Sequence, residues 1–182
     1  KEDQPIVIES SDKRNKWKGI YVNSKIIDKD ISFFDHVNIS DYSYFDNDKI
    51  QLTGGVNLIN GQFNLKNSQF KNSLAEDAIN FVNSRFKLKN LNVLNVNSDA
   101  IDIDFGKGQI INSRFQKISG DAIDLSGSNI FIKDIVVSKV ADKAISVGEE
   151  SILNIDNLNI SESRIGIASK DSSKVEGKKI KI

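Results

Sequence analysis

The segment DAINF at residues 77–81 decides the fold, because it recurs at a fixed interval. It returns as DAIDI at 99–103 and as DAIDL at 121–125, each copy 22 residues after the previous one. A fainter copy, KAISV, follows at 143–147, and GGVNL at 54–58 precedes the first copy with one extra residue in the interval. A period of about 20 to 50 residues indicates a protein built of stacked structural repeats.

The rest of each repeat keeps the same register, which separates a true repeat from a chance motif. Further positions stay mostly apolar from one copy to the next. They form the columns Phe86, Gly108, Ile130, Leu153 and Val175; Leu88, Ile110, Ile132 and Ile155; Leu91, Ser113, Ile135, Leu158 and Ile180; and Val93, Phe115, Val137, Ile160 and Ile182. Residues one period apart are therefore expected to occupy equivalent places.

Apolar residues alternate at a spacing of two within each repeat, as in Ile101 and Ile103, and this is the periodicity of a β-strand. Stacked strands of this kind pair in parallel, and parallel connections are right-handed. We therefore expect an all-β fold, a right-handed single-stranded parallel β-helix of about six coils of about 22 residues each. It would form one domain over 1–182, with an irregular N-terminal coil or cap and an insertion at 1–53 and regular coils at 54–182.

Asparagine or aspartate occupies one aligned position between two apolar columns, where the chain must bend. The column contains Asn67, Asn90, Asn112, Asp134 and Asn157. Stacked amides there can hydrogen-bond from coil to coil, which predicts an asparagine ladder. With this ladder and this repeat, residues 50–182 resemble the right-handed parallel β-helix superfamily typified by pectate lyases and related carbohydrate-active proteins.

Two segments carry a second resemblance. DKAISVGEES (142–151) and GIASKDSSKV (166–175) are similar to β-helix segments of bacterial envelope and secreted proteins. Together the resemblances imply an extracytoplasmic protein, secreted or in the cell envelope, that binds or acts on a polysaccharide.

Composition argues against several other classes of protein. The chain has 25 basic and 25 acidic residues, so no excess positive charge favours nucleic acid. No apolar run approaches the roughly 20 residues of a membrane span. Cysteine is absent, which excludes disulfides and cysteine-based zinc sites. Methionine is absent too, and we expect the chain to be part of a longer protein.

Aromatic residues gather in a polar insertion that precedes the regular coils. Tyr42 and Tyr44 lie in the segment DHVNISDYSYFDNDK at 35–49. Aromatic side chains in such a loop can form a lid or a ligand-binding surface, and they can equally cover the open end of the solenoid. At the other end the apolar alternation continues through Ile180 and Ile182, so a flanking domain or another subunit is expected to cover that coil.

Residues between the inward positions of the repeated strand are expected to face outward. One such column is small: Gly55, Ala78, Ala100, Ala122, Ala144 and Gly166. Beside it run Asn57, Asn80, Asp102, Asp124 and Ser146, followed by Asp104 in the next column. A low ledge bordered by carboxylates and amides suits an extended sugar chain, so these polar residues, with Tyr42 and Tyr44, are the predicted ligand-binding residues.

Asp102 and Asp124 should be neighbours at about 5 Å, with Asp104 nearby. Two carboxylates this close repel each other, which calls for a raised pKa, a bound Ca²⁺ or a cation such as Lys143. We therefore consider Asp102, Asp104 and Asp124 as calcium ligands, and Asp102, Asp124 and Lys143 as catalytic residues. In the resembled lyases, carboxylates of this kind hold Ca²⁺ and a basic residue abstracts a proton. The preceding column, Asp77, Asp99 and Asp121, fits a turn ladder that accepts backbone N–H groups.

Three functions remain open at this point. The first is a non-catalytic carbohydrate-binding or scaffold module of a bacterial secreted or envelope protein. The second is a polysaccharide lyase or hydrolase that acts on an acidic polysaccharide. The third is a structural spacer or assembly element that stacks end to end. The fold alone does not decide among them, because function depends on the site.

Overall fold

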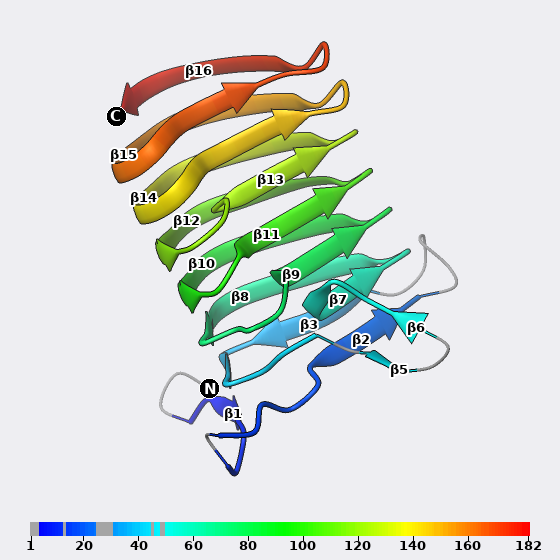
Figure 1. The fold of residues 1–182 in the computed structure, drawn as a ribbon. Helices are drawn as coiled ribbons and strands as arrows, with labels where there is room; N and C mark the ends of the chain where they lie inside the picture. Colours follow the sequence, from blue (N-terminus) through cyan, green and yellow to red (C-terminus); the bar gives the residue numbers. More distant parts are fainter. Residues whose placement is uncertain (1–3, 13, 25–30, 45, 48–49) are drawn as a thin grey trace.

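The computed structural model describes residues 4–12, 14–24, 31–44, 46–47 and 50–182. These residues form a parallel β-solenoid of about six turns and contain no helix (Figure 1). The strands are β1 (Ile6–Ile8), β2 (Ile20–Asn23), β3 (Ile31–Asp35), β4 (Val37–Ser40), β5 (Asp46–Asn47), β6 (Ile50–Gln51), β7 (Gly54–Ile59), β8 (Gln62–Lys71), β9 (Asp77–Val82), β10 (Arg85–Val96), β11 (Asp99–Asp104), β12 (Lys107–Ile118), β13 (Ile123–Ser126), β14 (Asn129–Gly148), β15 (Ile152–Ser169) and β16 (Lys174–Lys181).

The strand register confirms the period read from the sequence. Ile101 of β11 pairs with Ile79 of β9 on one side and with Ile123 of β13 on the other. Ile123 pairs in turn with Ile145 of β14. Among the described strands, every pairing in the solenoid is parallel, and the short β5–β6 pair is the one antiparallel pairing. Side chains that repeat along the sequence therefore become columns that run along the solenoid.

Three columns of bends close each coil, and in each of them the backbone adopts positive φ. Asparagine occurs repeatedly in these columns because it tolerates this conformation better than most residues do. The predicted ladder is present: Asn90 Nδ2 donates to Asn67 Oδ1 at 2.7 Å, and Asn112 Nδ2 donates to Asn90 Oδ1 at 2.8 Å. Two further ladders, which the sequence analysis did not identify, join Asn83 to Asn60 and Asn95 to Asn72, each at 2.8 Å.

The interior contains the aliphatic and aromatic columns that the repeat predicts, and it also contains the small column. Ala78, Ala100, Ala122 and Ala144 are fully buried members of the hydrophobic core. The expectation that they form an outward ledge is wrong. The repeated strand begins at a corner of the coil, where the alanine and the isoleucine that follows it are both buried.

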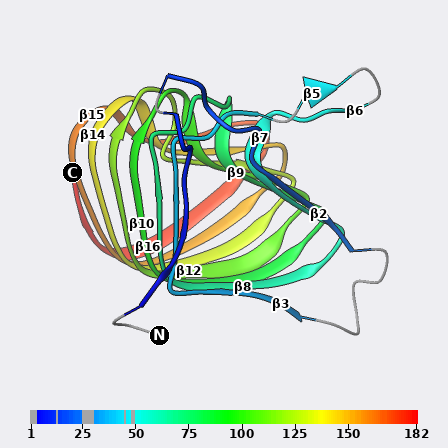
Figure 2. The same ribbon diagram turned by 90° about the horizontal axis from the view of Figure 1, so that it is seen from below.

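The N-terminal end of the solenoid is covered by its own aromatic residues. Figure 2 shows the N-terminal segment crossing this end of the coils. Trp17 Nε1 donates to the Ser40 carbonyl at 2.9 Å, and the Trp17 and Tyr42 ring centroids are 5.9 Å apart. Tyr42 is 0% exposed, so the expectation that it lies in an open binding loop is wrong. Its ring fills the space beside Gly55, where a Cβ atom would lie in contact with the ring.

At the opposite end, β16 pairs with β15 alone among the described strands. The prediction that a flanking domain or subunit covers this coil stays a prediction. In the described part of the chain, no helix has the length and hydropathy needed to cross a membrane.

Candidate functional site

The first candidate site is a group of carboxylates at the start of the repeated strands. Asp99 Oδ1 accepts a hydrogen bond from the Asp121 backbone N–H at 2.8 Å, and Asp121 Oδ1 accepts one from the Lys143 backbone N–H at 2.9 Å. This confirms the predicted turn ladder for Asp99 and Asp121, but not for Asp77, because the Asp99 backbone N–H donates to the Glu76 carbonyl instead. Each aspartate holds the corner of the following coil in place, which gives Asp99 and Asp121 a structural role.

A second polar column follows three residues later and runs beside the first. Asn80, Asp102, Asp124 and Ser146 occupy consecutive strands in register. Asp102 and Asp124 are therefore direct neighbours, as the sequence predicts. Neither carboxylate has a hydrogen-bond or ion-pair partner among the described residues.

Burial and repulsion perturb the acidity of this group. Burial, followed by the charges of Asp77, Asp104 and Asp124, raises the pKa of Asp102 to about 8. Burial also raises the pKa values of Asp77 and Asp99 to about 6. Asp102 is thus mostly protonated at neutral pH, and it lies beside Asn80 Oδ1, a buried acceptor with no partner among the described residues.

Lys143 is the cation of the acidic group. Its Nζ lies 3.0 Å from Asp121 Oδ2 and 2.6 Å from Asp142 Oδ2. Burial lowers the pKa of Lys143, but the hydrogen bonds to Asp142 and Asp121 outweigh that effect and raise it overall. A charged amine is a poor proton acceptor. The predicted role of Lys143 as a general base stays a prediction, and these two ion pairs oppose it.

The carboxylates that the structure brings together differ from the predicted metal ligands. One oxygen from each of Asp99, Asp121 and Asp124 lies within 4.8 Å of the others. No other trio of acidic, histidine or cysteine side chains in the described ranges converges in this way. Asp104 lies farther along β11, in register with Ser126, and the pKa of its carboxyl is raised mainly by burial.

The remaining predicted ligand-binding residues are less accessible than a ledge requires. Asn57 and Ser146 are buried, and Asn57 Nδ2 donates to the Gly54 carbonyl at 2.6 Å. Tyr44 is exposed, and Lys18 Nζ lies 5.5 Å from the centroid of its ring. Binding at these residues stays a prediction.

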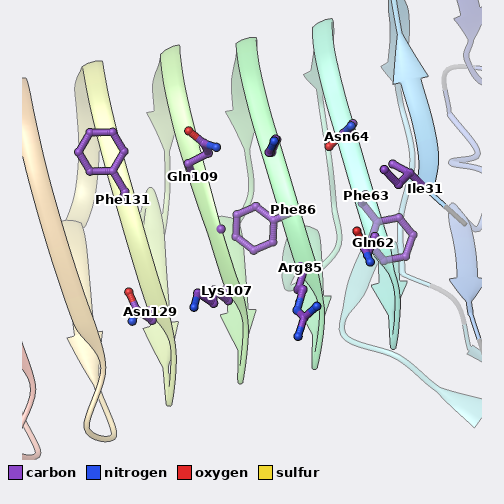
Figure 3. A pocket seen from close by; sticks show the side chains of 12 residues that line it. Ile31, Gln62, Phe63, Asn64, Arg85, Phe86, Lys107, Gln109, Asn129 and Phe131 are labelled. Atoms are coloured by element: carbon purple, nitrogen blue, oxygen red, sulfur yellow. The ribbon is translucent and has the colours of Figure 1, made fainter. Parts of the chain in front are cut away.

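A second candidate site lies on the neighbouring face of the coils, beyond the bend at Asn83 and Phe105. Here the first halves of β8, β10, β12 and β14 form a hollow of about 640 Å³, which we call the basic groove (Figure 3). Its lining residues are Ile31, Gln62, Phe63, Asn64, Arg85, Phe86, Lys87, Lys107, Gly108, Gln109, Asn129 and Phe131.

The basic groove presents two rows of polar side chains. Figure 3 shows Gln62, Arg85, Lys107 and Asn129 in one row across four neighbouring strands. Asn64, Lys87, Gln109 and Phe131 form the parallel row two residues farther along each strand. Within the described ranges, the lining contains three cations and no carboxylate.

The basic groove was not predicted from the sequence, because the candidate site was drawn from the outward side chains of only one strand per coil. The signal was available in the register, since Arg85 and Lys107 are 22 residues apart and Lys87 lies between amides at Asn64 and Gln109. Reading charge along every outward column identifies this face from the sequence alone.

Comparisons with known proteins add no family to this description. No family model matches the chain, and neither a curated protein nor a solved structure is similar to it at a significant level. The fold defines the class, a parallel β-solenoid with an asparagine ladder, and the groove and the acidic group are the features from which a function is argued.

Proposed function

We propose that the chain is a non-catalytic carbohydrate-binding module that binds an acidic polysaccharide in the basic groove. The observation that carries this proposal is a hollow whose lining, among the residues that the structure describes, contains three cations and four side-chain amides but no carboxylate. The resemblance to carbohydrate-active β-helix proteins, and to bacterial envelope and secreted proteins, supports the same class of ligand and an extracytoplasmic location.

The charge of the basic groove matches an anionic ligand. Arg85, Lys87 and Lys107 are exposed on two adjacent strands, so their charges lie within about 10 Å of one another. A polysaccharide with carboxylate or sulfate groups at regular intervals can contact several of these cations at once. Exposed ion pairs are weak individually, but repeated contacts along a chain add up.

The remaining lining residues fit the neutral part of a sugar chain. Asn64, Gln109 and Asn129 each offer both a donor and an acceptor to ring hydroxyl groups. Phe131, 37% exposed, provides an apolar surface at one end of the row. The four strands span about 14 Å, which accommodates a short stretch of an extended glycan.

Titration of the protein with acidic and neutral polysaccharides tests the proposal. Isothermal titration calorimetry with polygalacturonate, alginate and a sulfated glycan should detect binding that weakens as salt rises, and dextran should give no heat. The double variant K87Q/K107Q should bind about tenfold more weakly, because each lost contact contributes roughly 0.7 kcal/mol.

Arg114→Gln is the matched control for this titration. Arg114 is an exposed cation of β12 that points outward beyond the Asn112 bend and outside the basic groove. Its variant should bind as the wild type does. R114Q removes one charge and K87Q/K107Q removes two, so equal losses of binding free energy per charge removed would show that net charge alone governs binding. No heat with any acidic polysaccharide would refute the proposal.

The acidic group supports a second candidate function, cleavage of an acidic polysaccharide by a hydrolase or lyase reaction. The favouring observation is the pairing of Asp102, whose pKa is raised to about 8, with Asp124 on the adjacent strand. A neutral carboxylic acid beside a carboxylate is the arrangement used for acid–base catalysis. Release of reducing ends or of unsaturated products from acidic polysaccharides, lost in Asp102→Ala and in Asp124→Ala, would establish this activity, and its absence over a broad panel would exclude it.

A further inference from the structure

The bend between β11 and β12 carries an exposed aromatic side chain. Phe105 is 65% exposed, although it lies in the middle of the regular coils. Its backbone has a φ of 54°, and in the described part of the chain it is the one apolar residue other than glycine with a positive φ. This conformation is unfavourable for a bulky side chain, so Phe105 raises the free energy of the fold at a position where burial contributes little stabilisation.

The same column of bends shows which residue the fold itself favours. Asn60 and Asn83 precede Phe105 in this column, at φ values of 54° and 46°, and Asn83 Nδ2 donates to Asn60 Oδ1 at 2.8 Å. An asparagine at position 105 would tolerate the left-handed backbone and would extend this ladder to Asn83 Oδ1. The phenylalanine is therefore better explained by what its ring does at the surface than by the stability of the bend.

The following coil is shaped to accept this ring. Gly127 occupies the next bend of the column, at a φ of 59°, and a Cβ atom there would lie 2.7 Å from Cδ1 and 2.9 Å from Cε1 of Phe105. The ring therefore lies over the bare backbone of Gly127, and a side chain at that position would push it away. A ring held against the surface in this way is an apolar platform that is ordered before a ligand binds.

The platform borders the basic groove. Phe105 precedes Lys107 by two residues, so their Cα atoms are at most about 7 Å apart. Gly127 precedes Asn129, the register partner of Lys107, by the same interval. Figure 3 shows Lys107 and Asn129 in the row formed by the first residues of the strands, which is the row nearest this bend. A sugar ring on Phe105 thus has its carboxylate or sulfate group within reach of the Lys107 ammonium group.

We propose that Phe105 is a platform on which a sugar ring of the bound polysaccharide packs, at the edge of the basic groove. This inference rests on the proposed function and narrows its ligand. One face of a pyranose ring carries mainly C–H bonds, and such a face packs against an aromatic ring while the hydroxyl groups bind side chains or water. Lys107 and the other groove cations select the charge of the polymer, and Phe105 selects polymers built of sugar rings over other polyanions.

Calorimetric titration of the wild type and of Phe105→Asn with two kinds of polymer tests the platform. The polymers are the acidic polysaccharides named above and poly-L-glutamate, which carries carboxylates but no sugar ring. F105N should bind the polysaccharide about fivefold more weakly and should bind poly-L-glutamate as the wild type does. Phe105→Tyr, which keeps the ring, should retain most of the affinity for the polysaccharide. K87Q/K107Q should weaken the binding of both polymers, because it removes charge.

Two further measurements separate a platform from a residue that only stabilises the bend. In urea, F105N should unfold at a higher midpoint than the wild type, because asparagine suits the positive φ and extends the ladder. In Phe105→Trp, a saturating acidic polysaccharide should shift the added indole emission to shorter wavelength, because the sugar ring displaces water from the indole. The wild type, whose one tryptophan is Trp17 in the N-terminal cap, should show no such shift.

The outcomes distinguish the platform from the groove. If no acidic polysaccharide binds to the wild type, the proposed function itself fails and the platform fails with it. If the wild type binds but F105N binds as tightly, or weakens equally toward poly-L-glutamate, the groove stands and the platform is refuted. A lower urea midpoint in F105N would overturn the argument that the ring serves binding, as would an unchanged emission spectrum of F105W in saturating polysaccharide.

Discussion

At the residue scale, the most unusual feature is a pair of neighbouring carboxylates without a counterion. Asp102 and Asp124 lie side by side because the parallel register superposes residues 22 apart. The neighbours of this pair along the column are Asn80 and Ser146, which carry no charge. An asparagine at position 102 would therefore continue the uncharged column. The aspartate raises the free energy of the folded state at any pH at which its carboxyl group is ionised.

We therefore expect Asp102→Asn to stabilise the protein at high pH. The pKa of Asp102 is about 8 in the folded chain and about 4 in an unfolded chain, so the folded state holds the proton more tightly. The free energy of unfolding then falls as pH rises from about 4 to about 8. The penalty is absent below that window and complete above it, so D102N should gain up to about 5 kcal/mol at pH 9, the free-energy equivalent of a four-unit shift, and almost nothing at pH 4.

Urea unfolding in EGTA buffer at several pH values measures this difference. The comparison of D102N with the wild type cancels the contributions of Asp77 and Asp99, which both proteins share. A difference in unfolding free energy that does not change between pH 4 and pH 9 would contradict the raised pKa.

At the element scale, the bends between the strands set the shape of each coil. Each bend places a residue at positive φ, as at Asn67 (51°), Asn90 (56°) and Asn112 (47°), and side-chain amides connect these bends along the solenoid. An asparagine at such a bend tolerates the left-handed conformation and also satisfies its neighbours' hydrogen bonds.

Two substitutions at Asn90 separate these contributions. Asn90→Ala should lower the free energy of unfolding by about 2 kcal/mol, because the left-handed backbone conformation is unfavourable for alanine and both ladder hydrogen bonds are lost. Asn90→Gly keeps the conformation and should lose about 1 kcal/mol. Chemical denaturation measures both, and equal losses in the two variants would show that the backbone conformation contributes nothing.

The two-residue alternation of a strand predicts which side chains point inward only in the part of the coil where that alternation is regular. The strand alternation gives Ile101 and Ile103 as inward residues, and both are buried. The same alternation assigns Ala100 to the outside, and here it fails, because Ala100 and Ile101 are consecutive residues near the start of β11 and both are buried. The alignment of Asp102 with Asp124 follows from the period, whereas the convergence of Asp99 with Asp124 depends on the shape of the coil there.

At the scale of the whole molecule, the solenoid separates two chemistries on adjacent faces. The basic groove collects Arg85, Lys87 and Lys107 on one face, and the acidic group collects Asp99, Asp121 and Asp124 around the next bends. The net charge of zero conceals this separation, because composition averages over columns that the fold keeps apart. The two faces are therefore recognised only when charge is compared along the columns that the register defines, and not from the composition.

The register of the stacked coils is the claim on which both sites depend, and cysteine cross-linking tests it most directly. The chain contains no cysteine, so pairs can be introduced cleanly. In N92C/R114C the two Cα atoms should be about 4.8 Å apart, within disulfide reach, because Asn92 and Arg114 are register partners. In L94C/R114C the separation should be about 8 Å, beyond that reach. Mild oxidation should link the first pair within the monomer and leave the second reduced; preferential linkage of the second pair would contradict the stacking of residues 22 apart.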